Sequence, residues 1–228
     1  SYDRTVKLRD IKTGECLKAL NGHSWAINCV VFSPDSKTIA TGGSANSEIK
    51  LWNSTTGECL NTLYGHEDWI RSMSFSSNGK ILASGSTDQS VKLWDIDTGE
   101  CIRTLKWNNQ GVNTLAFGAY NNTLAIGCTD DVIKLWDINS EADFKTLEGH
   151  KDSVLSVVFG LDCKILVSGS TDQTVKLWDI QTKKCLKTFK WDNDGVNDVA
   201  ISSDSKIIAA AGWNGIIKIW NIQTGECI

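Results

Sequence analysis

Residues 174–179 read TVKLWD, and this hexapeptide returns along the chain with its tryptophan in a fixed phase. The tryptophans are 42 residues apart, at Trp52, Trp94, Trp136, Trp178 and Trp220. The segments that hold them read EIKLWN, SVKLWD, VIKLWD, TVKLWD and IIKIWN. Arg9, in TVKLRD, takes the same place 43 residues before Trp52, and one extra residue near 45–46 accounts for the difference. Such a period is the primary evidence for a repeat architecture.

Within one period the pattern is that of short strands. Residues 148–189 show it best: SVLSVVFG alternates between polar and apolar residues, and so does ILVSGS, with the turn LDCK between them. A second turn, STDQ, leads to TVKLWDI and then to KCLKTF. This order predicts a four-stranded antiparallel meander. One such sheet cannot bury both of its faces, so radial stacking of several sheets is favoured over a sandwich.

Gly-His pairs stand upstream of three of these tryptophans, at Gly22-His23, Gly65-His66 and Gly149-His150. A Gly-His pair followed by Leu-Trp-Asp or Leu-Trp-Asn at this spacing resembles the WD-repeat (WD40) family, and the resemblance spans the whole chain. It implies an all-β fold, a β-propeller of four-stranded antiparallel blades. We expect a half-blade at 1–20 and blades at 21–63, 64–105, 106–147, 148–189 and 190–228. We expect this set to be a fragment of a seven-bladed ring, with closure at six blades as the alternative.

The resemblance also implies a buried hydrogen-bonded network in each blade, made by a His, a Ser or Thr, an Asp and the repeated Trp. Two repeats match it fully, with His66, Ser84, Asp88 and Trp94 in one and His150, Ser168, Asp172 and Trp178 in the other. A third has His23, Thr41, Asn46 and Trp52, with Asn in place of Asp.

The remaining two repeats lose the His and the hydroxyl together. One has Asn108 and Ile126, and the other has Asp192 and Ala210. A half-satisfied buried network strands a polar group at a cost of about 1–3 kcal/mol, so joint loss is the less costly change. In both repeats a tryptophan, Trp107 or Trp191, replaces the Gly of Gly-His. We expect these two rings to pack between blades or against a loop, because rings of that size usually bury most of their area.

His66, Ser84 and Asp88 also have the side chains of a hydrolase triad, with Ser84 as nucleophile and His66 as base. The same set recurs in register with the tryptophans, and no G-x-S-x-G turn accompanies it. We therefore interpret it as structural and predict no catalytic residues.

Composition excludes several other functions. Lys and Arg number 23 against 27 Asp and Glu, and the basic residues are scattered, which argues against nucleic-acid binding. No apolar run approaches the roughly 18 residues of a membrane span. Five of the eight cysteines occupy equivalent turns of successive repeats, and there is no C-x-x-C or Cys–His cluster. We predict no metal, no cofactor and no membrane contact, and reduced thiols in the cytoplasm.

In the family, binding residues lie three and five positions after the His and just before the turn Asp. Carried over by position, the first set is Ala26, Trp69, Gly111, Ser153 and Gly195, the second Asn28, Arg71, Asn113, Leu155 and Asn197, and the third Ala45, Thr87, Thr129, Thr171 and Trp213. Trp and Arg dominate interface hot spots, which singles out Trp69, Arg71 and Trp213. Either tryptophan could instead pack between blades, and the asparagines could line a polar ring or be solvated.

These observations predict a non-catalytic scaffold that binds other proteins or peptides. The predicted partner-binding residues are Trp69, Arg71, Trp213, Asn28, Asn113, Leu155 and Asn197. The alternative is a sensor or regulatory domain of a larger signalling protein, whose partners would include other domains of its own chain. An enzyme would need a carboxylate pair or a metal in the channel, and nothing in the sequence supplies either.

Overall fold

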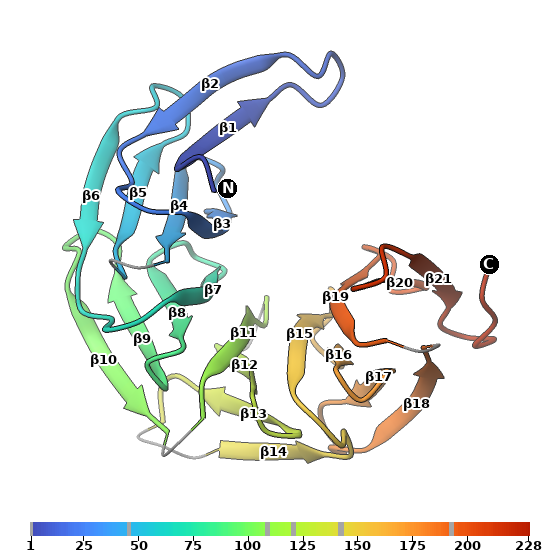
Figure 1. The fold of residues 1–228 in the computed structure, drawn as a ribbon. Coiled ribbons are helices and arrows are strands. Elements are labelled where there is room, and N and C mark those ends of the chain that lie inside the picture. The colour runs from blue at the N-terminus through green and yellow to red at the C-terminus, as the bar shows by residue number, and fades with distance from the viewer. Residues whose placement is uncertain (1, 45–46, 108–109, 120–121, 141–143, 192–193) are drawn as a thin grey trace. The chain divides into compact units, whose positions relative to one another are not determined.

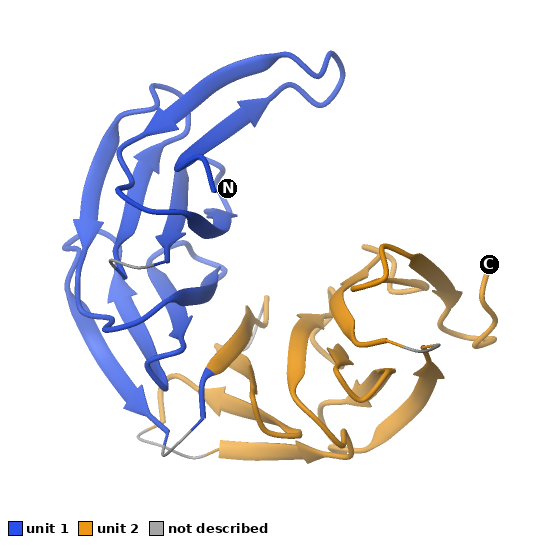
Figure 2. Ribbon diagram, viewed as in Figure 1, with its two compact units in different colours: residues 1–111 blue, residues 112–228 orange. Residues whose placement is uncertain are grey.

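A computed structural model describes residues 2–44, 47–107, 110–119, 122–140, 144–191 and 194–228 of the chain. These residues form antiparallel β-sheets (Figure 1). Within the described residues no helix is long and apolar enough to cross a membrane. The chain divides into two compact units, residues 1–111 and residues 112–228 (Figure 2).

Unit 1 contains one two-stranded sheet and two four-stranded sheets. The two-stranded sheet is β1 (Thr5–Arg9) and β2 (Cys16–Asn21). The next sheet runs in the order β3 (Ile27–Phe32), β4 (Thr38–Gly43), β5 (Ile49–Asn53), β6 (Cys59–Leu63). The third runs β7 (Ile70–Phe75), β8 (Ile81–Ser86), β9 (Ser90–Asp95), β10 (Cys101–Lys106). Strands adjacent in sequence are adjacent in space, so each sheet is a meander, or blade.

Unit 2 repeats this arrangement. Its first blade is β11 (Val112–Phe117), β12 (Thr123–Cys128), β13 (Val132–Asp137), β14 (Phe144–Glu148). Its second is β15 (Val154–Phe159), β16 (Ile165–Ser170), β17 (Thr174–Asp179), β18 (Cys185–Lys190). Its third is β19 (Val196–Ile201), β20 (Ile207–Gly212), β21 (Ile217–Asn221), and an isolated bridge joins Trp220 to Cys227. The expected all-β fold of four-stranded antiparallel blades is confirmed; the number of blades in a ring stays a prediction.

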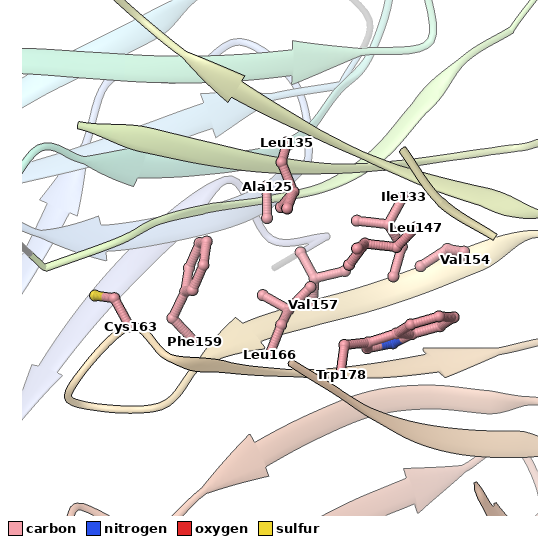
Figure 3. Packing of buried hydrophobic residues seen from close by; sticks show 10 residues of the cluster. All are labelled: Ala125, Ile133, Leu135, Leu147, Val154, Val157, Phe159, Cys163, Leu166 and Trp178. Atoms are coloured by element: carbon pink, nitrogen blue, oxygen red, sulfur yellow. The ribbon is translucent and has the colours of Figure 1, made fainter. Parts of the chain in front are cut away.

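Apolar side chains of one blade pack on the first two strands of the next. In unit 2, Ile133 and Leu135 of β13 meet Val157 and Phe159 of β15 in one buried cluster (Figure 3). The approach is close at Gly169 of β16, where an added Cβ would lie 2.6 Å from Val196 Cγ1 of β19. Only glycine fits there, because the backbone itself forms the contact surface.

The same packing joins the two blades of unit 1. Ile49, Leu51 and Leu63 of the first blade share a buried cluster with Met73 and Phe75 of β7. Residues at alternate positions of a strand face the same side of its sheet, so the period-2 pattern of the sequence fixes which side chains enter these layers.

Candidate functional site

Two blades, one in each unit, contain the complete His–Ser–Asp–Trp network. In the β15–β18 blade, His150 Nε2 lies 2.6 Å from Ser168 Oγ, and Trp178 Nε1 donates to the same oxygen at 2.8 Å. His150 Nδ1 lies 2.8 Å from Asp172 Oδ2. The β7–β10 blade repeats these distances to within 0.1 Å. His66 Nε2 lies 2.7 Å from Ser84 Oγ, Trp94 Nε1 donates to that oxygen at 2.8 Å, and His66 Nδ1 lies 2.7 Å from Asp88 Oδ2.

The aspartate defines the proton positions in this network. An ionised carboxylate only accepts, so the imidazole N–H at Nδ1 donates to it, and the serine O–H donates to Nε2. Burial by itself would raise the pKa of Asp88 and Asp172. Hydrogen bonds from the histidine, from Ser90 or Thr174, and from a backbone N–H outweigh burial and hold both pKa values well below their usual range.

These two carboxylates make stability depend on pH. Because the pKa is lower in the folded than in the unfolded chain, their contribution is complete above about pH 5 and is lost progressively as the pH falls below that value. We expect the free energy of unfolding to fall between pH 5 and pH 3, and to fall less steeply in an Asp88→Asn/Asp172→Asn variant. Urea titrations at each pH measure this, with exposed Asp97→Asn/Asp162→Asn as the control. Equal slopes in all three proteins would contradict the assignment.

The β3–β6 blade has the histidine and hydroxyl of the network, and a glutamate lies beside the histidine. Asn46, the predicted counterpart of the aspartate, lies outside the described residues. His23 Nε2 bonds Thr41 Oγ1 at 2.6 Å, and its Nδ1 is 3.0 Å from Glu48 Oε1, a contact by distance whose geometry is not that of a hydrogen bond. Burial lowers the His23 pKa, and Glu48 opposes this shift. Sequence reasoning missed Glu48, although an acid in the place of Ser90 and Thr174 was the available signal.

In the β19–β21 blade the network is replaced by aromatic packing. Trp191 is 4% exposed, and its ring centroid lies 5.9 Å from that of Trp220. Gly212 leaves room for it, since an added Cβ there would lie 2.6 Å from the indole. Ala210 is buried and has no hydroxyl, as expected for a repeat that lost the histidine and the hydroxyl together. Asp192, and Asn108 of the other variant repeat, lie outside the described residues; Ile126 is fully buried and Trp107 is half-buried.

The histidine networks cannot act as hydrolase triads. Ser84 and Ser168 are 0% exposed and each accepts from an indole N–H, so a substrate cannot reach either hydroxyl. Among the described residues no group of three or more His, Cys, Asp or Glu could hold a metal ion. The buried sites therefore serve the fold, and a functional surface must be sought outside them.

The loops that precede the first strand of each blade, with the turn between its second and third strands, form what we call the top face of each unit. At this end every complete first strand has a β-bulge. Register is lost between Ile27 and Cys29, and at the equivalent place in the other four blades. The skipped residues are Asn28, Arg71, Asn113, Leu155 and Asn197. A bulge re-aims its side chain, which explains why this position differs from the rest of the strand.

Two of the bulge asparagines connect neighbouring blades. The Asn28 amide donates to the Ile70 carbonyl at 3.3 Å in unit 1, and Asn113 donates to Val154 at 3.2 Å in unit 2. Leu155 is half-buried in β15. These contacts give Asn28 and Asn113 a structural role, and their predicted partner contacts stay a prediction.

Trp69 and Arg71 lie together on the top face of unit 1. The Trp69 side chain is 47% exposed, and the Arg71 guanidinium carbon is 6.0 Å from its ring centroid. Trp25, on the preceding blade, is also exposed. Ala45 lies outside the described residues. Arg71 itself is exposed and retains donors for a ligand.

Trp213 and Asn197 lie together on the top face of unit 2. Trp213 is 59% exposed, and its indole N–H donates to Asn197 Oδ1 at 3.2 Å. Neighbouring loops also touch, since Ser153 Oγ donates to the Thr129 carbonyl at 2.9 Å. Ser153, three positions after a histidine, therefore contacts Thr129, which precedes a turn aspartate in the adjacent blade. Sequence spacing alone could not reveal this contact.

Four-stranded antiparallel blades, several of them with the same buried histidine network, define an all-β repeat protein. The family model described as WD domain, G-beta repeat matches residues 14–53, 57–95, 99–137, 143–179 and 183–221. The chain belongs to this family, whose repeats generally mediate protein–protein interaction and are typically non-catalytic. No curated protein matches the chain.

Proposed function

We propose that this chain is a non-catalytic scaffold that binds another protein through its top faces. Exposed indole rings at positions that the family resemblance assigns to binding carry the proposal. The repeated tryptophans of the LWD segments are buried to 4% exposure or less, whereas Trp69 and Trp213 are 47% and 59% exposed. Large aromatic rings left in solvent beside an arginine are the residue types of interface hot spots.

Their surroundings support this interpretation. Arg71 lies over Trp69, and Asn197 accepts from Trp213, so each ring has a polar partner beside an open apolar surface. An interface centre of this kind gains from burying the ring while its polar neighbour selects the partner. Neither Trp69 nor Trp213 belongs to the buried clusters that hold the blades together.

A Trp69→Ala/Arg71→Ala/Trp213→Ala variant is expected to lose the protein partner. Because a hot-spot side chain contributes about 2 kcal/mol or more, the dissociation constant should rise at least about thirtyfold. The measurement is affinity purification from the source cells, followed by calorimetric titration with the purified partner. Circular dichroism must show that the variant has the wild-type fold.

A matched control removes three exposed apolar side chains from outer strands. Leu60, Ile102 and Leu186 lie on β6, β10 and β18, and each is more than half exposed. Their triple alanine variant should bind as wild type does. If the top-face variant retains its partner, or both variants lose it equally, the proposed surface is wrong.

A further inference from the structure

Trp213 is exposed, but its orientation is fixed. Its indole N–H donates a hydrogen bond to Asn197 Oδ1. Its ring lies over Gly195, where an added Cβ would be 3.4 Å from Trp213 Cζ3 and 3.3 Å from Thr171 Cα. A glycine floor and a hydrogen-bonded edge leave the opposite face of the ring open to solvent. Such a platform loses little conformational freedom when a ligand lies on it.

The loops around this platform carry an excess of negative charge. The described top-face loops of unit 2, residues 129–131, 151–153, 171–173, 194–195 and 213–215, contain five aspartates and one basic residue, Lys151. No described lysine or arginine forms an ion pair with Asp131, Asp152 or Asp194. Backbone amides orient two of them, since Ser153 N donates to Asp152 and Gly195 N to Asp194. Asp194 therefore lies next to the floor of the indole.

On the basis of the proposed function, we infer that Trp213 and Asp194 bind a cationic side chain, arginine or lysine, from a basic segment of the partner. An indole face attracts a cation more strongly than other aromatic rings do. An acidic segment would meet unpaired carboxylates of the same sign. An apolar segment would bury those carboxylates without compensation. A basic side chain can lie over the indole ring and also pair with the aspartate carboxylates.

The test follows the indole N–H signal of Trp213 by nitrogen–proton NMR, assigned from a Trp213→Leu variant. The probe is a capped peptide of alternating glycine and arginine, and the control peptide has citrulline, the neutral isostere, in place of arginine. We expect a saturable shift with arginine only. Calorimetric titration, which does not depend on the Trp213 signal, should show binding about two- to fivefold weaker in Trp213→Leu, as for an exposed cation–π contact. Asp194→Asn keeps the acceptor for Gly195 N and should weaken binding at low salt.

Two internal controls separate the site from general electrostatics. Asp162→Asn makes the same charge change in an exposed loop between β15 and β16 and should leave the affinity unchanged. The Trp69 signal should shift less, because Arg71 already lies over that ring. Equal shifts with arginine and citrulline, or equal effects of Asp194→Asn and Asp162→Asn, would overturn the inference.

This outcome can be distinguished from failure of the proposed function. If Trp213→Ala alone weakens the natural partner but the arginine peptide leaves Trp213 unchanged, the protein-binding surface stands and the basic class of ligand is wrong. If the peptide binds as expected but the top-face triple variant keeps its partner, the cation site stands and the proposed function is wrong.

Discussion

Replacement of Trp178 by alanine is expected to lower the free energy of unfolding by about 3–5 kcal/mol, as for other large aromatic side chains removed from a core. Trp178 is 0% exposed, packs in the cluster with Val157 and Leu166, and donates its indole N–H to Ser168. Loss of the Trp178 side chain leaves a cavity and leaves Ser168 Oγ without the indole donor. This is a large fraction of the roughly 5–15 kcal/mol that stabilises a typical domain.

Urea denaturation followed by circular dichroism measures the effect without relying on tryptophan fluorescence. Trp213→Ala removes an equally large ring that is 59% exposed, and this control should change the free energy of unfolding by less than about 0.5 kcal/mol. Trp178→Phe keeps a ring but loses the donor and should fall between the two. A loss below about 1 kcal/mol for Trp178→Ala would show that the blade interior relaxes around the cavity.

The second large effect concerns the pair His150 and Ser168. Ser168→Ala leaves both His150 Nε2 and the Trp178 N–H without their partner. At about 1–3 kcal/mol for each of the two stranded groups, we expect the free energy of unfolding to fall by about 2–6 kcal/mol. In a His150→Leu background, the imidazole that Ser168→Ala would leave without a partner is already absent. The double variant should therefore be less destabilised than the sum of the singles, by about 0.5–3 kcal/mol.

A double-mutant cycle by urea denaturation at pH 7 tests this coupling. The control cycle combines Ser168→Ala with Leu60→Ala, an exposed residue of unit 1 that shares no partner with Ser168, and should be additive within about 0.5 kcal/mol. An additive His150/Ser168 cycle would remove the physical explanation for why the variant repeats lack both groups. That explanation is already consistent with the β19–β21 blade, where Ala210 and Trp191 are both buried.

Much of the fold could be predicted from the sequence because the repeat is close to periodic. Five tryptophans in phase, with alternating strands and turns between them, leave few alternatives to stacked four-stranded meanders. The partners of His66 and His150 came from the resemblance to the WD-repeat family, which was applied to each repeat at the same offsets. Where one repeat departs from the others, prediction was weaker: no other repeat has an acid at the position of Glu48, which lies beside His23.

The sequence by itself therefore determined the all-β class, the blade as repeating unit and which repeats carry the histidine network. Tertiary structure alone decided what the predicted binding positions contact. Strand spacing does not reveal that Asn28 and Asn113 bond the next blade while Asn197 holds an exposed indole. These differences arise from bulges and from neighbouring loops, whose contacts join residues about 16 to 42 positions apart. A local pattern specifies the direction of a side chain, but the neighbouring loop or blade determines whether it is engaged or left open for a ligand.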